Sequence, residues 1–174
     1  MALTQYYTAT TLDGFIADAN HSLDWLFTLE QDRGGPLNYA SFFAGVGALA
    51  MGAHTYEWVL DHEQGKWPYA LPCWVFTHRD LPVAHETVEL TADDVAVVHE
   101  RMREAAGERN IWIVGGGGLA GQFAGRGLLD EVIVYIAPVT LGAGAPLLSQ
   151  HVELRLEELA RNGDFACARY AVVR

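Results

Sequence analysis

Short apolar runs alternate along this chain with segments that have a helical period. Five runs are rich in β-branched, aromatic and other apolar side chains: residues 3–10, 48–52, 71–77, 111–114 and 132–137. Runs of about four to eight such residues, bounded by glycine, proline or polar residues, predict buried strands. At the end of the chain, residues 154–160 and 165–173 predict a hairpin around Asn162-Gly163.

Three segments between these runs predict helices: residues 37–45, 91–107 and 119–125. In the second segment, apolar residues recur at helical intervals before Gly107 ends the pattern. Thr91 and Asp94 have the spacing of a capping box, so we expect this helix to begin at Thr91.

Strands that alternate with helices and end in a hairpin predict an α/β fold with a mixed, mainly parallel sheet and an antiparallel edge. A length of 174 residues, with 51% hydrophobic and 19% charged residues, fits one globular domain over residues 1–174. Residues 132–150 carry no charge and are long enough to resemble a membrane span. Prolines and glycines interrupt this stretch, so we interpret it as a buried strand and a loop.

Charge and cysteine content narrow the classes of partner. A formal net charge of −11 argues against nucleic acid and anionic membranes as partners, so any phosphate site must be a local exception. Cys73 and Cys167 form no metal or redox motif, and no basic segment leads an apolar run at the N-terminus. We therefore expect free thiols and a cytoplasmic protein. The histidines show no ligand spacing with acids, so we predict no metal site.

Four consecutive glycines, Gly115 to Gly118, follow the predicted strand at 111–114 directly and lead into a short helix. Free N–H groups and the helix dipole make such a helix start an anion site, which predicts a phosphate-bearing cofactor. Gly116, Gly118 and Gly121 also match the dinucleotide fingerprint G-x-G-x-x-G. Too few residues follow for the further βα units of a Rossmann fold. A tight turn with no ligand remains the other alternative.

Two more predicted strands end in residues suited to phosphate. Gly52 precedes His54 and Thr55, and Thr55 either caps a helix or binds a phosphate. Thr77, His78 and Arg79 follow the next strand, where Arg79 either grips a phosphate or pairs with Asp80.

These segments carry a resemblance. Residues 51–57, 77–79 and 114–123, in this order, resemble the dihydrofolate-reductase-like superfamily. Residues 12–17, 24–26, 129–131 and 138–144 are similar to one branch of it, which holds the reductase domain of the bifunctional riboflavin-pathway deaminase-reductase and its small stand-alone relatives. The resemblance covers nearly the whole chain and implies a three-layer α/β/α fold that binds NADPH.

The resemblance also implies positions around the cofactor. Gly52 and Thr55 would meet its phosphates, and Thr77, His78 and Arg79 would surround the adenosine 2′-phosphate. Ile16 and Ala17 would cover the nicotinamide, and a cis peptide would fall at Gly115-Gly116. The pyrophosphate and nicotinamide side would be wrapped by Val114, Gly115, Gly116, Gly117, Gly118 and Leu119.

Two departures from the superfamily pattern matter. Ala53 stands where an arginine is common, so one phosphate contact is missing, and His54 or Arg79 is left to compensate. Residues 36–39 contain no acid where folate reductases hold the pterin ring, which argues against dihydrofolate as the substrate.

Hydride transfer requires orientation and a proton, and the cofactor carries the reactive hydrogen. Asp13 and Asp24 are the candidate acids, with a turn residue and a helix N-cap as their plainer interpretations. The candidate substrate-side residues are Trp25, Tyr39, Phe43 and Pro138, although aromatic residues at the spacing of Tyr39 and Phe43 are also typical of core packing.

The resulting hypothesis is an NADPH-dependent reductase of a small heterocyclic or carbonyl substrate, with pyrimidine-reductase-like activity ranked above folate reduction. One alternative is a nucleotide-binding or dimerisation module that has lost the reaction. Another is a flavin-binding reductase, which predicts a yellow protein. The expected partners are a small-molecule substrate and a second copy of the chain in a homodimer.

Overall fold

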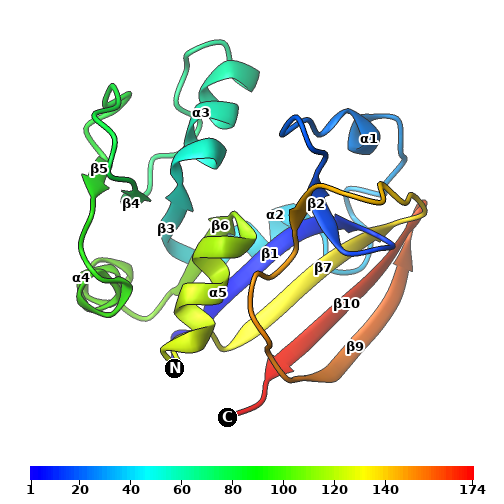
Figure 1. Cartoon of the computed structure of the whole chain (residues 1–174). Helices are drawn as coiled ribbons and strands as arrows, with labels where there is room; N and C mark the ends of the chain where they lie inside the picture. Colours follow the sequence, from blue (N-terminus) through cyan, green and yellow to red (C-terminus); the bar gives the residue numbers. More distant parts are fainter.

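A mixed sheet runs through the whole molecule in the computed structural model, which describes residues 1–174 (Figure 1). Its strand order is β5-β4-β3-β6-β1-β7-β10-β9. The strands are β1 (Thr4–Thr11), β3 (Val46–Gly52), β4 (Cys73–Phe76), β5 (Val88–Thr91), β6 (Asn110–Gly115), β7 (Glu131–Ala137), β9 (Leu154–Asn162) and β10 (Phe165–Val172). All neighbours from β5 to β7 pair parallel, whereas β10 is antiparallel to β7 and β9. The predicted sheet, with its antiparallel edge, is confirmed.

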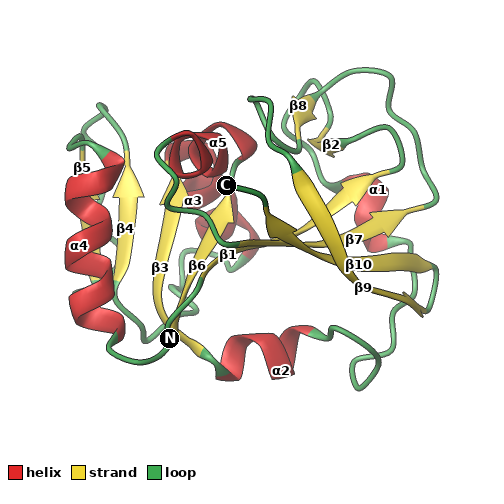
Figure 2. Ribbon diagram, turned by 90° about the horizontal axis from the view of Figure 1, so that it is seen from below, coloured by secondary structure: helices red, strands yellow, loops and turns green.

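Helices cover both faces of this sheet (Figure 2). They are α1 (Asp24–Phe27), α2 (Tyr39–Ala44), α3 (Ala53–His62), α4 (Val95–Ala106) and α5 (Gly117–Gly125). Residues of α4 and α5 join one hydrophobic cluster with the sheet, and residues of α2 and α3 join another. The three-layer arrangement that the resemblance implies is therefore present.

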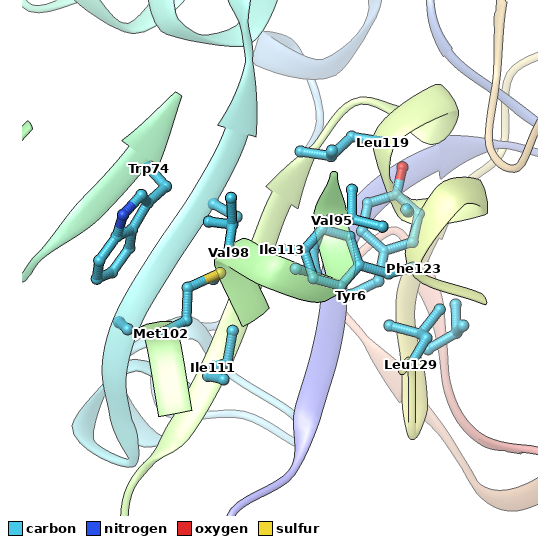
Figure 3. Packing of buried hydrophobic residues seen from close by; sticks show 14 of the residues in the cluster. Tyr6, Trp74, Val95, Val98, Met102, Ile111, Ile113, Leu119, Phe123 and Leu129 are labelled. Atoms are coloured by element: carbon cyan, nitrogen blue, oxygen red, sulfur yellow. The ribbon is translucent and has the colours of Figure 1, made fainter. Parts of the chain in front are cut away.

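Strand alternation explains the two cores. In β6, Ile111 and Ile113 pack under α4 and α5 (Figure 3). Trp112, between them in the chain, packs on the opposite face with α2 and α3. In β3, Ala50 and Leu49 divide in the same way. Successive side chains of a strand point to opposite faces, so a strand buried on both faces needs a continuous apolar run. This is the pattern that made both strands recognisable in the sequence.

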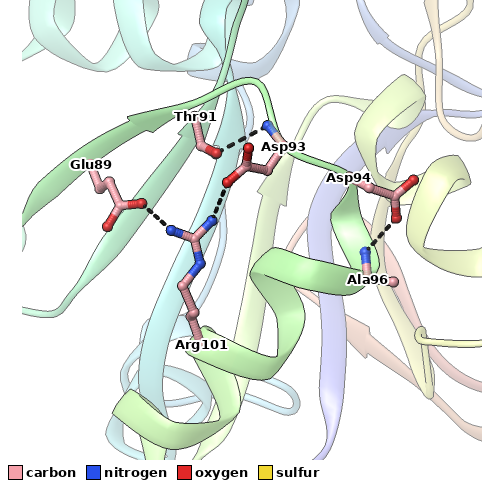
Figure 4. Close-up of polar contacts among 6 residues, drawn as sticks. All are labelled: Glu89, Thr91, Asp93, Asp94, Ala96 and Arg101. Atoms are coloured by element: carbon pink, nitrogen blue, oxygen red, sulfur yellow. Dashed lines mark hydrogen bonds and ion pairs between the residues drawn. The ribbon is translucent and has the colours of Figure 1, made fainter.

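The helix predicted over residues 91–107 is α4, and its predicted start at Thr91 is wrong (Figure 4). Thr91 is the last residue of β5, and its hydroxyl oxygen accepts a hydrogen bond from the Asp93 N–H at 3.2 Å. Asp94 is the N-cap of α4, and its carboxylate accepts the Ala96 N–H at 2.9 Å. Asp94 is therefore the N-cap itself and not the second residue of a capping box. The sequence pattern did not predict β5, because this strand is short and half of its residues are polar.

Two small strands, β2 (Phe15–Ala17) and β8 (Ala145–Pro146), form an antiparallel pair outside the main sheet. β8 lies in the loop that follows β7, within the charge-free stretch. No helix of the structure has both the length and the apolar character needed to cross a bilayer.

Candidate functional site

The carboxyl ends of β3 and β6 lie side by side, and each strand passes through glycine into a helix. Met51 pairs with Gly115 across the two strands. From there α3 leads to β4 on one side, whereas α5 leads to β7 on the other, and the two helices cover opposite faces of the sheet. In open α/β sheets, ligands bind beyond the carboxyl ends of strands at such a change of direction.

Both helices present unpaired N–H groups at this point. Gly116 is the N-cap of α5, and the Ala120 N–H donates to its carbonyl at 3.1 Å. The N–H groups of Gly117, Gly118 and Leu119 precede this bond and have no acceptor within the helix. Gly52 caps α3 in the same way, with no side-chain hydrogen bond. Two adjacent helix N-termini suit a ligand with two phosphate groups.

The glycines of this corner, Gly115 to Gly118, do not all serve the fold. Gly115 has φ +148°, a conformation that other residues rarely adopt, and its peptide bond to Gly116 is cis, as the resemblance implies. A Cβ on Gly117 would overlap the Pro146 carbonyl oxygen. A Cβ on Gly118, in contrast, would meet nothing within 4 Å. The tight-turn alternative therefore explains Gly115 and Gly117 but gives no reason for glycine at 118.

The β2–β8 pair covers one side of the glycine corner. Ile16 Cδ1 lies 3.5 Å from the place where a Gly116 Cβ would be. Opposite, Thr55 Oγ1 lies 3.5 Å from the corresponding place at Gly115. Ala17 is buried within the pair and lies against Gly144. Gly52 pairs with Phe76, which directly precedes Thr77, so the fold brings the predicted cofactor residues of four separate segments into one region.

Arg79 has a partner that the sequence did not indicate. Its guanidinium donates two hydrogen bonds to the Glu57 carboxylate on α3, at 3.2 and 2.8 Å, and it does not pair with Asp80. These bonds lower the pKa of Glu57 below its ordinary value, and the positive charge of Arg79 adds to the shift. The Thr77 hydroxyl accepts the Arg79 N–H at 3.0 Å, which shapes the turn after β4. His78 is exposed beside them.

Stacked rings join the loop around α1 to α3, a contact that the sequence analysis missed. His54 stacks on His21 with ring centroids 4.4 Å apart, and Phe27 stacks on Trp58 and His62. His54, Trp58 and His62 recur at intervals of four along α3, a spacing that places them on one side of the helix. That periodicity was visible in the sequence, but its partners were not.

Asp13 is held as a turn residue. Its carboxylate accepts hydrogen bonds from the Thr11 hydroxyl at 2.6 Å and from the Gly142 N–H at 2.7 Å. The Thr11 bond is the main reason why the pKa of Asp13 lies below its ordinary value, and the backbone N–H groups add to the shift. A carboxylate that is kept ionised and paired in this way is poorly suited to donate a proton, so the turn interpretation fits better.

The remaining candidates divide between surface and core. Asp24 lies exposed in the first turn of α1, whose N-cap is Leu23, so Asp24 is not the cap itself. Tyr39 and Phe43 stack on each other and meet Trp112 edge to face, but Tyr39 is 44% exposed, whereas Phe43 is half-buried against the α2 and α3 core. The other substrate-side and cofactor-side candidates lie as follows: Trp25 in the cluster around Tyr135, Pro138 exposed after β7, Val114 half-buried in β6, and the Leu119 side chain in the main core.

A hollow of about 380 Å³ lies away from the glycine corner, between α2 and the strands. None of the predicted site residues lines it. Its lining residues are Gln5, Tyr7, Leu37, Asn38, Ser41, Phe42, Gly45, Asn110, Ile133 and Arg169.

Known proteins resemble the chain along its whole length. A family model described as the RibD C-terminal domain matches residues 4–164. The uncharacterized protein YwjB of Bacillus subtilis is 33% identical over 171 residues, which is 96% of each chain. A Shewanella crystal structure, provisionally assigned to riboflavin biosynthesis, is 26% identical, covers 100% of both chains and superimposes with a TM-score of 0.81.

A more distant structure comes from Thermotoga maritima. It is a diaminohydroxyphosphoribosylaminopyrimidine deaminase/5-amino-6-(5-phosphoribosylamino)uracil reductase, 16% identical, with a TM-score of 0.66. The match covers 99% of this chain but 57% of that protein, and at this identity it supports the fold alone. Together these likenesses confirm the fold and the family that the motifs predicted.

Proposed function

This chain belongs to the RibD C-terminal domain family, and we propose that it is an NADPH-dependent reductase acting on a small heterocyclic or carbonyl substrate. The observation that carries the proposal is Gly118, a glycine that the fold does not need at a helix N-terminus beside a second helix N-terminus. A backbone without a side chain at this point lets a diphosphate approach the free N–H groups.

In this proposal the chain binds and orients, and the bound cofactor supplies the hydride from its reduced nicotinamide ring. The N–H groups at the starts of α3 and α5 hold the diphosphate. Ile16 and the β2–β8 pair shield the corner from water, which strengthens these charge-assisted bonds. Thr55 and Arg79 give further contacts on the side of β4.

A pyrimidine-like ring is the substrate class that we favour. The Shewanella relative is provisionally assigned to riboflavin biosynthesis, and residues 36–39 offer no acid to hold a pterin. Asp24 is the candidate acid whose carboxylate makes no hydrogen bond within the chain. Asp24→Asn keeps the size of the side chain, so it should lower turnover without changing NADPH affinity if Asp24 transfers a proton.

Titration with NADPH, followed by nicotinamide fluorescence, tests the proposal. We expect micromolar binding, and no binding of NADPH or NADH at millimolar concentration would refute the proposal. Oxidation of bound NADPH by a pyrimidine substrate separates a reductase from the non-catalytic module, which the missing charge at Ala53 keeps as the second candidate. That module predicts binding with no turnover.

We also propose a homodimer. β9 is the outer strand of the sheet, with Leu156 and Leu159 exposed at 51% and 66%. Light scattering gives the mass in solution, and a monomer at micromolar concentration would contradict this assignment.

A further inference from the structure

Within residues 52–57, 77–80 and 115–119, which begin where β3, β4 and β6 end, Arg79 is the only arginine or lysine. Ala53 offers no charge, and the chain as a whole is strongly acidic. This single cation is already engaged, because both of its terminal nitrogens donate to Glu57. The two side chains remain 51% and 42% exposed, so a ligand can reach them.

The Arg79–Glu57 pair lies on the β4 side of the corner. Glu57 comes two residues after Thr55, whose hydroxyl lies beside Gly115, and Arg79 follows the strand next to β3. In an open α/β sheet a dinucleotide binds where the strand order reverses, and one nucleoside then lies on each side of its diphosphate. The β2–β8 pair covers the other side, through Ile16. One ribose of a bound dinucleotide would therefore lie close to this ion pair.

We infer that Glu57 sets the choice between NADPH and NADH by competing with the 2′-phosphate for Arg79. This inference rests on the proposed function. A 2′-phosphate that approaches Arg79 must displace the Glu57 carboxylate or accept a negative charge beside it. The 2′-hydroxyl of NADH can instead donate a hydrogen bond to that carboxylate, as riboses do to acids in other dinucleotide folds. Glu57 thus weakens the preference for NADPH that Arg79 alone would create.

An ordinary surface ion pair is the competing explanation. Exposed pairs contribute little to stability, and many have no further role. The two explanations predict different results for a variant that removes the charge of Glu57 and keeps the shape of its side chain. Only an ion pair that lies at the ribose would change the ratio of the affinities for NADPH and NADH.

The experiment measures dissociation constants of NADPH and NADH by calorimetry for the wild type and for Glu57→Gln. We expect NADPH to bind about tenfold more tightly to the variant, because the repelling charge is gone and Arg79 is free. NADH should bind about threefold more weakly, because a neutral amide replaces a charged acceptor. Thermal unfolding of the variant serves as the check on folding.

Glu158→Gln is the matched control. Glu158 pairs with Arg169 at 3.0 Å, both side chains are 40% exposed, and the pair lies on β9 and β10 at the opposite end of the sheet (Figure 1). Glu158→Gln removes the same charge as Glu57→Gln but lies far from the glycine corner. It should therefore leave the dissociation constants of NADPH and NADH unchanged. An equal effect of the two variants would show a general charge effect and overturn the inference.

The remaining outcomes separate this inference from the proposed function. If both dinucleotides bind and Glu57→Gln leaves their ratio unchanged, Glu57 has no part in the choice, while the proposed function stands. If neither dinucleotide binds to any of the proteins, both conclusions fail together.

Discussion

Gly118→Ala separates a ligand-binding glycine from a structural one. The new Cβ would meet no protein atom within 4 Å, and the residue already lies in the first turn of α5. Alanine is favoured over glycine in helices, so the free energy of unfolding should stay the same or rise by up to about 1 kcal/mol.

Cofactor binding should change in the opposite direction. The methyl group would occupy the open space through which a diphosphate reaches the N–H groups of the helix. Loss of one hydrogen bond to a charged phosphate costs about 1.5–3 kcal/mol, which weakens NADPH binding by roughly 10- to 100-fold. Fluorescence titration gives the affinity, and chemical denaturation gives the stability.

Two controls frame this measurement. Gln122→Ala makes an exposed change on the same helix and should leave NADPH binding unchanged. Gly117→Ala would overlap the Pro146 carbonyl oxygen and should lower stability by about 1–3 kcal/mol, so its binding defect has a structural cause. Unchanged NADPH affinity in Gly118→Ala would refute the reasoning, because the corner would then have no close ligand.

Three further predictions concern charge and thiols. Arg79→Ala should weaken the binding of NADPH more than that of NADH, because only NADPH carries a 2′-phosphate for the guanidinium to contact. An equal loss of affinity for both, measured by titration, would show that the 2′-phosphate does not lie at Arg79. Asp13→Asn should unfold at a lower temperature than the wild type at neutral pH, because the Thr11 and backbone bonds lower the Asp13 pKa in the folded state. That difference should be complete above the ordinary pKa of 3.8 and disappear as the pH falls through the lower folded-state pKa; a difference that persists in strong acid would contradict it. Burial raises the pKa of Cys167 to about 11 and also raises the pKa of Cys73, so neither thiol should react with a thiol reagent at neutral pH before unfolding. Rapid reaction of the native protein would disprove that burial.

The sequence pattern predicted an element correctly where the residues that decide its structure are consecutive in the chain. The apolar runs of β3 and β6 and the terminal hairpin could be predicted because strands buried on both faces and tight turns leave marks in consecutive residues. The start of α4 was predicted at the wrong residue because Thr91 and Asp94 have the spacing of a capping box, whereas Asp94 alone is the N-cap. Only the pairing of β5 with β4 shows that Thr91 belongs to a strand.

Contacts between segments required the tertiary structure. Nothing near Arg79 in the sequence points to Glu57, and Asp80 was the natural neighbour to expect. Likewise, Asp13 was identified as either an acid or a turn residue, and the N–H groups of the distant loop at Leu141 and Gly142 favour the turn. Side-chain pairing of this kind depends on which loops meet at a sheet edge.

The sequence by itself determined the alternation of strands and helices, the glycine-rich helix starts and the family of the chain, because these depend on residues close together along the backbone. The tertiary structure alone decided that Gly52 and Thr55 face Gly115, that Glu57 holds Arg79 and that Gly118 opens onto empty space. The physical reason is strand order: β3 and β6 become neighbours only when the whole sheet assembles, and only that packing distinguishes a glycine needed for space from one left free for a ligand.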